Sequence, residues 1–187
     1  HMLTAPYYHI GIVVHNYKEA IAHYSNVLDL KFTQPTDSVL CIENPQTQQT
    51  ESIQVVALYS RTRPPYLELI QANGNGIFSE KNAGRILYFG MWEPDIEGRI
   101  KKLKQQGIGI EALISSECGK PANAIITAPD KMGVRMEYLS TSLRVVTEAW
   151  ILTGKYPLAS QRDRKSGGEG KGGGRGGRRV RKKKAEK

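Results

Sequence analysis

Two copies of one sequence pattern each contain two residues that could hold a metal ion or carry a proton. The copies lie in residues 8–70 and 87–138, and the four residues are His9, Glu68, Tyr88 and Glu137. One imidazole and two carboxylates suit Mn²⁺, Fe²⁺, Co²⁺, Ni²⁺ or Zn²⁺, and the residue types alone do not choose among these ions. If the two copies pack symmetrically, the four side chains converge on one site.

The repeat is visible in residues that recur at a constant spacing. Gly90 follows Gly11 by 79 residues, and the same spacing separates Tyr88 from His9. Each copy begins with an apolar strand, continues with a helical pattern and ends in a strand that holds one glutamate within an apolar run. We therefore expect each copy to be a βαβββ unit.

A glutamate in the middle of a half-buried strand is unusual, because strands are depleted in this residue. If Glu68 and Glu137 point into a concave surface, each carboxylate needs a partner there, since an unpaired buried charge costs several kcal/mol. A divalent cation with His9 is one such partner. The alternative is that both glutamates point outward to lysines or solvent.

The elements of the first copy begin with a strand over residues 8–14. Asn16 followed by Glu19 has the form of a capping box, so a helix should run from there to Leu28, with one apolar face toward a sheet. We expect further strands at 30–33, 52–59 and 65–71. Most of residues 34–50, rich in Gln, Thr and Pro, should be loop.

The second copy predicts the same order of elements. We expect a strand at 86–92, a helix that starts at Pro94 and Asp95 and ends at Gly107, and strands at 110–114, 122–128 and 133–139. Residues 143–158 have a helical pattern. The predicted division is therefore a first module over 1–72, a second over 73–141, an extension over 142–161 and a tail over 162–187.

The formal net charge of +9 belongs to the tail alone. Residues 162–187 hold 12 Lys and Arg and 3 Asp and Glu, whereas the other 161 residues hold 15 of each sign. This Gly-, Lys- and Arg-rich tail should be disordered. It could contact nucleic acid or an anionic surface weakly or act as a nuclear-import signal, and a solvated tail without a binding role is the alternative.

The cysteines and the hydropathy of the chain indicate in which cellular compartment the protein is expected. Cys41 and Cys118 fit no metal or disulfide spacing, which favours a reducing compartment. The opening His1-Met2 is typical of a cloning remnant, no signal peptide follows it, and no apolar run could span a membrane. A cytoplasmic protein is expected, with the nucleus as an alternative through the tail.

Over residues 7–140 the chain resembles the vicinal oxygen chelate superfamily, which includes glyoxalase I, methylmalonyl-CoA epimerase, extradiol dioxygenases and bleomycin resistance proteins. The matching segments are residues 9–14 with the helix over 19–24, 67–70, 95–97, 128–130 and 133–137. The resemblance implies an α+β fold, in which paired βαβββ modules form a curved, half-open mixed sheet around a central cup. It also implies a divalent metal ion, a small-molecule substrate and, in many members, a homodimer.

Carried over onto this chain, the resemblance makes His9, Glu68 and Glu137 the metal ligands. The chain departs from the family at Tyr88, because many members place a histidine there. Tyr88 could bind the metal as a phenolate, act as an acid or base, donate a hydrogen bond to substrate, or mark a site that has lost its metal. The departure makes an extradiol dioxygenase less expected.

Strand alternation predicts which residues lie beside these four. Tyr66, Trp92 and Arg135 share faces with the candidate ligands and are expected to bind substrate, Arg135 through an anionic group. The alternative for Arg135 is a structural ion pair with Glu137. The small residues Gly11 and Gly90 should leave space for substrate.

The implied activity is that of a glyoxalase-like, metal-dependent isomerase or lyase. It would act through a metal-chelated enolate of a small substrate with vicinal oxygens, with Glu68 or Glu137 as general base and Tyr88 as a further catalytic candidate. The first alternative is a metal-free protein of the same fold that sequesters a small molecule. A nucleic-acid-associated protein with the body as a scaffold is the second.

Overall fold

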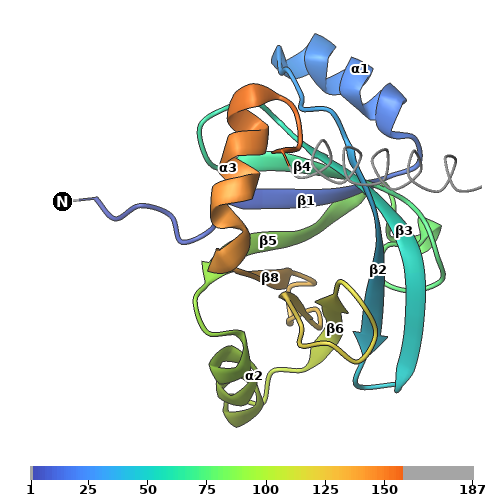
Figure 1. Cartoon of the computed structure of the whole chain (residues 1–187), viewed down its shortest axis with the longest axis vertical. Coiled ribbons are helices and arrows are strands. Elements are labelled where there is room, and N and C mark those ends of the chain that lie inside the picture. Colours follow the sequence, from blue (N-terminus) through green and yellow to red (C-terminus); the bar gives the residue numbers. More distant parts are fainter. Residues whose placement is uncertain (1, 158–187) are drawn as a thin grey trace, which may run out of the picture.

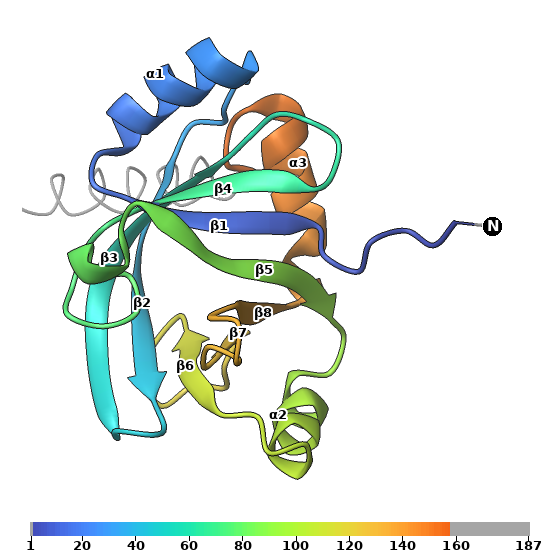
Figure 2. The same cartoon turned by 180° about the vertical axis from the view of Figure 1, so that it is seen from behind.

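The structure is a computed structural model, and it describes residues 2–157. Its eight strands form one closed barrel in the order β1-β4-β3-β2-β6-β7-β8-β5. Figures 1 and 2 show the barrel from two opposite sides, with the helices on its outside. The predicted α+β class, with a curved sheet around a central cup, is confirmed, and the sheet closes on itself where β2 meets β6.

The first copy begins as its sequence predicts. Strand β1 (His9–Val14) is followed by helix α1 (Tyr17–Leu28), and the Asn16 side chain accepts hydrogen bonds from the backbone N–H groups of Lys18 and Glu19. This cap satisfies two of the free donors of the first helical turn. Helix α1 packs on the outside of β4 (Tyr66–Gln71).

Two predictions within the first copy are wrong. Residues 30–33 form no strand beyond a single bridge between Phe32 and Ser60, and the supposed loop over 34–50 contains most of a long hairpin. That hairpin is β2 (Thr36–Asn44) and β3 (Gln49–Tyr59). Its composition is polar because much of its length faces solvent on one side, as the alternating burial of β2 shows.

The elements of the second copy lie close to their predicted positions. Strand β5 (Arg85–Glu93) leads to helix α2 (Ile96–Gln105), where the Asp95 side chain caps the N-terminus by accepting from the Gly98 N–H. Strands β6 (Ile110–Ser115), β7 (Ala124–Thr127) and β8 (Arg135–Ser140) complete it. Helix α3 (Arg144–Thr153) follows, and the 162–187 tail lies outside the described residues.

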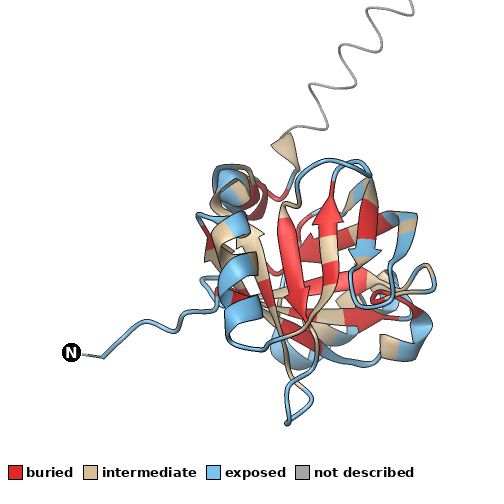
Figure 3. Ribbon diagram, turned by 90° about the horizontal axis from the view of Figure 1, so that it is seen from below, coloured by how far each residue is buried: buried red, intermediate tan, exposed pale blue. Residues whose placement is uncertain are grey.

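Two seams join the copies. At the first, β1 pairs antiparallel with β5, so that His9 lies opposite Gly90 and Gly11 opposite Tyr88. At the second, β2 pairs antiparallel with β6 over three residue pairs, from Cys41–Ser115 to Glu43–Leu113. Figure 3 shows buried residues concentrated in the barrel strands and exposed residues on the helices and hairpins.

Apolar side chains fill much of the barrel interior. One cluster inside the barrel includes Val13, Ile42, Ile70, Ile114 and Ile126. A second cluster lies under α1 and α3 and includes Leu58, Leu69 and Trp150. Helix α3 is held in place because the Trp150 indole N–H donates to the Gln34 carbonyl at 2.8 Å and Arg61 donates to the carbonyls of Ile151 and Leu152.

The expectation of two unpaired cysteines is wrong. Cys41 of β2 forms a disulfide with Cys118 in the loop after β6, with their Cα atoms 5.1 Å apart. Seventy-seven residues separate the two cysteines in sequence, and only the β2–β6 pairing brings them together. The disulfide removes the cysteine-based argument for a reducing compartment. None of the helices in residues 2–157 is long and apolar enough to cross a membrane.

Candidate metal centre

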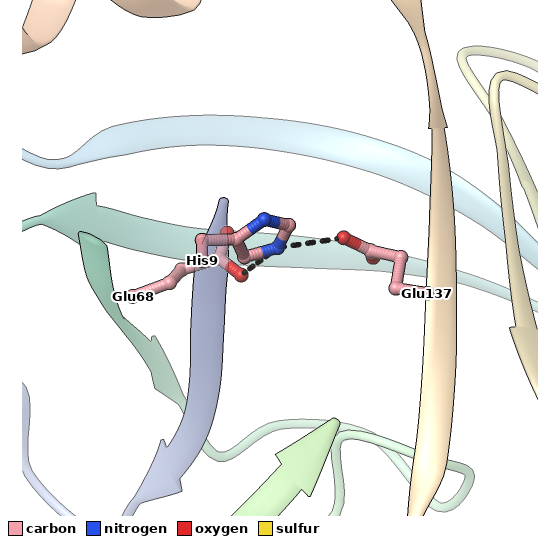
Figure 4. A group of neighbouring side chains, drawn as sticks. All are labelled: His9, Glu68 and Glu137. Atoms are coloured by element: carbon pink, nitrogen blue, oxygen red, sulfur yellow. Dashed lines mark hydrogen bonds and ion pairs between the residues drawn. The ribbon is translucent and has the colours of Figure 1, made fainter. Parts of the chain in front are cut away.

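His9, Glu68 and Glu137 meet inside the barrel, as their positions in the repeat predict. The Nε2 atom of His9 lies 2.9 Å from Oε1 of Glu137 and 3.5 Å from Oε1 of Glu68. One possible ligand atom from each residue lies within 4.8 Å of the others, and all three side chains are buried. Figure 4 shows the imidazole between the two carboxylates.

Strand pairing explains why residues so distant in sequence converge. The strands β4, β1, β5 and β8 are consecutive neighbours in the barrel. The parallel β1–β4 register sets Gly11 beside Glu68, and the parallel β5–β8 register sets Gly90 beside Glu137. Since His9 lies opposite Gly90, side chains at period two on these strands face one interior site.

Tyr88 occupies the fourth position of the repeat, where it contacts Glu68. Its hydroxyl donates a short hydrogen bond to Oε1 of Glu68, and the tyrosine is buried. Burial, followed by the negative charges of Glu137 and Glu68, raises the pKa of the Tyr88 phenol well above its usual value of 10. Without metal the Tyr88 phenol therefore stays protonated at neutral pH and acts as a hydrogen-bond donor to Glu68.

The two repeated glycines make room for the protein's own rings, and the expectation that they leave space for substrate is wrong. A Cβ atom on Gly90 would overlap the His9 ring, and one on Gly11 would overlap the Tyr88 ring. The His9 ring of the first copy thus lies on Gly90 of the second, and the Tyr88 ring of the second copy lies on Gly11 of the first. This reciprocal packing fixes both rings across the β1–β5 seam.

Two tyrosines that sequence reasoning missed also line the centre. The Tyr8 and Tyr59 rings lie 4.2 Å and 5.7 Å from the His9 ring, measured between centroids. The pKa of each phenol is raised, first by burial and then by the charges of Glu68 and Glu137. Tyr59 lies opposite Glu68 in the β3–β4 register, which is the signal that could have identified it.

The charge state of the centre without metal follows from its geometry. Burial alone lowers the pKa of His9, but hydrogen bonds and charge interactions with Glu137 and Glu68 outweigh it and raise the pKa to about 9. The pKa of the Glu137 carboxyl is raised by burial, against the opposing effect of His9. At neutral pH and without metal, a protonated His9 ring therefore lies beside Glu137 and Glu68.

The predicted substrate residues lie on opposite sides of this centre. In the β5–β8 register, Glu137 lies beside Gly90. Arg135 lies beside Tyr88, two residues before Glu137 along β8, and Trp92 lies beside Leu139, two residues after it. Arg135 and Trp92 therefore lie on opposite sides of Glu137 along the strands. Trp92 stacks on Tyr8 with centroids 4.1 Å apart, and Tyr66 is half-buried with its ring 6.2 Å from that of Tyr59. Tyr59 and Tyr66 pack in one apolar cluster with Trp150 of α3.

Arg135 lies at the other, polar end. Its Nε atom is 2.8 Å from Oε2 of Glu111, so its ion pair is with Glu111 and the alternative of a pair with Glu137 is wrong. Arg135 and Glu111 line a cavity of about 800 Å³, together with Lys81 and the polar start of β3. Two residues along a strand span about 7 Å, so Arg135 remains close to the metal centre.

The residues of the centre fit a divalent metal ion. Two carboxylates and one imidazole with converging ligand atoms give a donor set for Mn²⁺, Fe²⁺, Co²⁺, Ni²⁺ or Zn²⁺. A cation would replace the proton on Nε2 and offset the charge of both carboxylates. The Nδ1 atom of His9 has no hydrogen-bond partner among the described residues, so packing against the surrounding rings and Gly90 orients the imidazole.

Fold and site together define a class of protein, in which a repeated βαβββ pattern forms one sheet around a buried cluster of metal-ligand type. Residues 8–123, more than half of the chain, match the family model of the Glyoxalase/Bleomycin resistance protein/Dioxygenase superfamily. The chain belongs to this superfamily. No curated protein sequence matches it.

Several solved structures are similar in fold. A hypothetical protein from Bacillus halodurans has 20% identity and a TM-score of 0.48, covering 72% of this chain and 93% of its own. Methylmalonyl-CoA epimerase from Mycobacterium tuberculosis has 17% identity and a TM-score of 0.48, covering 78% and 97%. The corresponding epimerase from Streptomyces coelicolor has 16% identity and a TM-score of 0.47, covering 74% and 95%.

Proposed function

We propose that this chain is a metal-dependent isomerase or lyase that acts on a small substrate with two neighbouring oxygen atoms. The observation that carries the proposal is the convergence of His9, Glu68 and Glu137 within the barrel, with ligand atoms less than 4.8 Å apart. Membership in the superfamily supports it, because the residues implied by the family pattern are the ones that meet.

In this proposal His9, Glu68 and Glu137 hold the metal, which when bound supplies a Lewis acid to the substrate oxygens. Tyr88 fixes the orientation of Glu68 through its hydrogen bond. Glu137 takes and returns the proton at the carbon next to those oxygens, because its carboxylate lies at the centre beside His9 and can act as a base when it is released from the metal or adjacent to it.

Arg135 and the polar cavity complete the proposed substrate site. The Arg135 guanidinium uses Nε and Nη2 for Glu111, which leaves Nη1 for an anionic group of the substrate. The opposite end is packed with Tyr66, Trp92 and Trp150, so substrate binding by Tyr66 and Trp92 is less well supported than binding by Arg135.

A first experiment measures metal content and affinity. Wild-type protein should bind one Mn²⁺, Co²⁺ or Zn²⁺ per chain, and His9→Gln and Glu137→Gln should lose it. The matched control is His15→Gln, because His15 pairs with Glu80 on the exposed surface, outside the barrel. If His9→Gln bound metal as tightly as His15→Gln, the proposed centre would be wrong.

A second experiment tests proton transfer. NMR in D₂O would follow exchange of the C–H next to the carbonyl in a panel of small 2-oxo and 2-hydroxy acids and thioesters. Exchange should stop on chelation of the metal, and in Glu137→Gln assayed with excess metal it should fall at least roughly a hundredfold, in line with the usual contribution of a general base.

One observation favours the alternative of a metal-free binding protein. The centre is largely satisfied without a cation, because the His9 imidazolium faces both carboxylates and Tyr88 donates to Glu68. Under this alternative, protein freed of metal by a chelator would bind one of these small acids or thioesters with unchanged affinity and would catalyse no C–H exchange.

A further inference from the structure

The Cys41–Cys118 disulfide closes the barrel at the seam opposite the metal centre. Cys41 lies opposite Ser115 in the β2–β6 register, and Cys118 lies in the exposed loop that follows β6. The metal-centre strands β4, β1, β5 and β8 form the other side of the barrel. The disulfide thus links the two copies where they are joined by three residue pairs.

This seam controls whether the sheet is open or closed. If β2 and β6 separate, the strand order becomes an open sheet, β2-β3-β4-β1-β5-β8-β7-β6, with the metal-centre strands in its middle. Ile42 and Ile114, which pair at the seam, belong to the interior cluster, so separation would loosen the packing beneath the centre. His9, Glu68 and Glu137 are all buried, so a looser seam would add to the access that the polar cavity beside Arg135 provides.

A cavity lies directly beside the disulfide. It has a volume of about 410 Å³, and its lining includes both cysteines, Ile96 and Ile100 of α2, and Lys120. Cys118 is exposed, whereas Cys41 is 5% exposed. Cys118 is therefore the more accessible of the two cysteines to a small thiol, and Cys41 is the expected leaving group.

We propose that Cys41–Cys118 is a thiol-exchange site, and that its reduction by a small thiol releases the β2–β6 seam and opens the barrel toward the metal centre. A thiolate of the reductant attacks Cys118 Sγ, which forms a mixed disulfide and releases Cys41 as a thiolate that takes a proton from water. A second thiolate attacks the reductant's sulfur in that mixed disulfide. This step releases the Cys118 thiolate and oxidises two reductant thiols to one disulfide.

Glutathione is the probe for the chemistry, and single-cysteine variants are the matched pair. In Cys41→Ser the exposed Cys118 should form a mixed disulfide with oxidised glutathione. Cys118→Ser, which leaves the shielded Cys41, should react at roughly a tenth of that rate or less, because the reaction rate depends on access to the thiol. Mass spectrometry measures both rates, and equal rates would overturn the assigned point of attack.

Hydrogen exchange tests the opening of the seam. Backbone amides of β2 and β6 in the full chain should exchange at least roughly tenfold faster after reduction, while those of β1 and β5 keep their protection. The Cys41→Ser/Cys118→Ser variant should behave like the reduced protein with or without thiol. Unchanged exchange at β2 and β6, or uniform loss of protection across all strands, would overturn the proposal.

The consequence for the metal centre rests on the proposed function, and it is measured separately. Co²⁺ binding at equilibrium, followed by its absorption bands, tests the centre itself in both redox states. The rate of Co²⁺ uptake tests the seam, and it should rise on reduction in wild-type protein and show no response to reductant in the double variant. Absence of Co²⁺ binding in either state would refute the metal centre and leave the exchange result standing.

Discussion

The glycines beneath His9 and Tyr88 are the residues on which the geometry of the centre depends most directly. A side chain at Gly90 displaces the ring of a candidate ligand, His9, whereas one at Gly11 displaces the ring of Tyr88, which acts on the ligands only through its hydrogen bond to Glu68. Overpacking of this kind typically costs about 1–3 kcal/mol.

We therefore expect Gly90→Ala and Gly11→Ala to lower the free energy of unfolding by similar amounts, and Gly90→Ala to weaken metal binding more than Gly11→Ala, which acts on Glu68 only through Tyr88. Gly90→Ala should weaken Mn²⁺ or Zn²⁺ binding by tenfold or more, because it moves a ligand. Calorimetric titration and chemical denaturation measure the two quantities. Equal metal affinity in both variants would contradict the reciprocal packing as the source of the geometry.

Tyr88 supports Glu68 from the fourth position of the repeat. Tyr88→Phe removes the hydrogen bond to Glu68 and keeps the ring on Gly11, and loss of such an outer partner usually costs roughly 10–100-fold in metal affinity. Tyr88→His, with a fourth potential ligand, should bind metal more tightly than Tyr88→Phe. The same affinity in Tyr88→Phe and wild type would show that Tyr88 does not position Glu68.

The pKa values of the centre predict how stability depends on pH without metal. Since the folded-state pKa of His9 is raised from 6.5 to about 9 and that of Glu137 is also raised, the folded protein holds more protons than the unfolded chain. Stability should therefore be highest below about pH 6.5 and fall as pH rises toward 9, with a slope of at most about 1.4 kcal/mol per pH unit for the His9 proton.

Urea denaturation of chelated protein across this pH range measures that slope. His9→Gln should remove the contribution of the His9 proton to this slope between pH 6.5 and 9. Metal affinity should change in the opposite direction and rise with pH, because the metal displaces the Nε2 proton. A wild-type stability that is constant or rises with pH would contradict an imidazolium at this site.

Among the elements, helix α1 provides stability without touching the centre. Its N-cap Asn16 accepts two backbone hydrogen bonds, and the helix packs on the outside of β4. Asn16→Ala should cost about 1 kcal/mol, whereas Asn26→Ala, at an exposed position within the same helix, should cost little. Denaturation curves give both values, and metal affinity should be unchanged in both variants.

The sequence predicts elements well where local patterns are strong. Asn16 with Glu19, and Asp95 before the Ile96 helix, mark helix starts that the structure confirms. The pattern fails at β2, because the Gln-, Thr- and Pro-rich stretch around it suggests loop, whereas pairing with β3 and β6 makes a strand of residues 36–44. Tertiary pairing there overrides composition.

The same limit applies to the site. The repeat identifies His9, Glu68, Tyr88 and Glu137 because equivalent positions in paired copies converge. It does not reveal that Gly11 and Gly90 are covered by rings, or that Arg135 pairs with Glu111, since both depend on rotamers and register. The Cys41–Cys118 disulfide was missed for a related reason, because it needs the β2–β6 seam that composition hides.

On the scale of the whole molecule, the disulfide joins the two copies covalently. It closes a loop between residues 77 positions apart, for which the chain-entropy model gives about 4.5 kcal/mol and measured bridges usually less. Cys41→Ser/Cys118→Ser should therefore lower the free energy of unfolding by about 2–4 kcal/mol and leave the strands folded, with only the β2–β6 seam released. Denaturation and circular dichroism measure this, and an unfolded double variant would show that the barrel strands alone do not suffice.

The reciprocal packing at the β1–β5 seam has a consequence for how such a centre can change during evolution. In a symmetric dimer of two identical half-length chains, the positions of His9 and Tyr88 would hold the same residue. A substitution at one position would then also change the other. With the halves fused into a single polypeptide, His9 can be retained while its counterpart becomes Tyr88. Fusion of the two halves thus allows the two sides of the centre to differ. A symmetric dimer of two equal halves could not acquire this difference by one substitution.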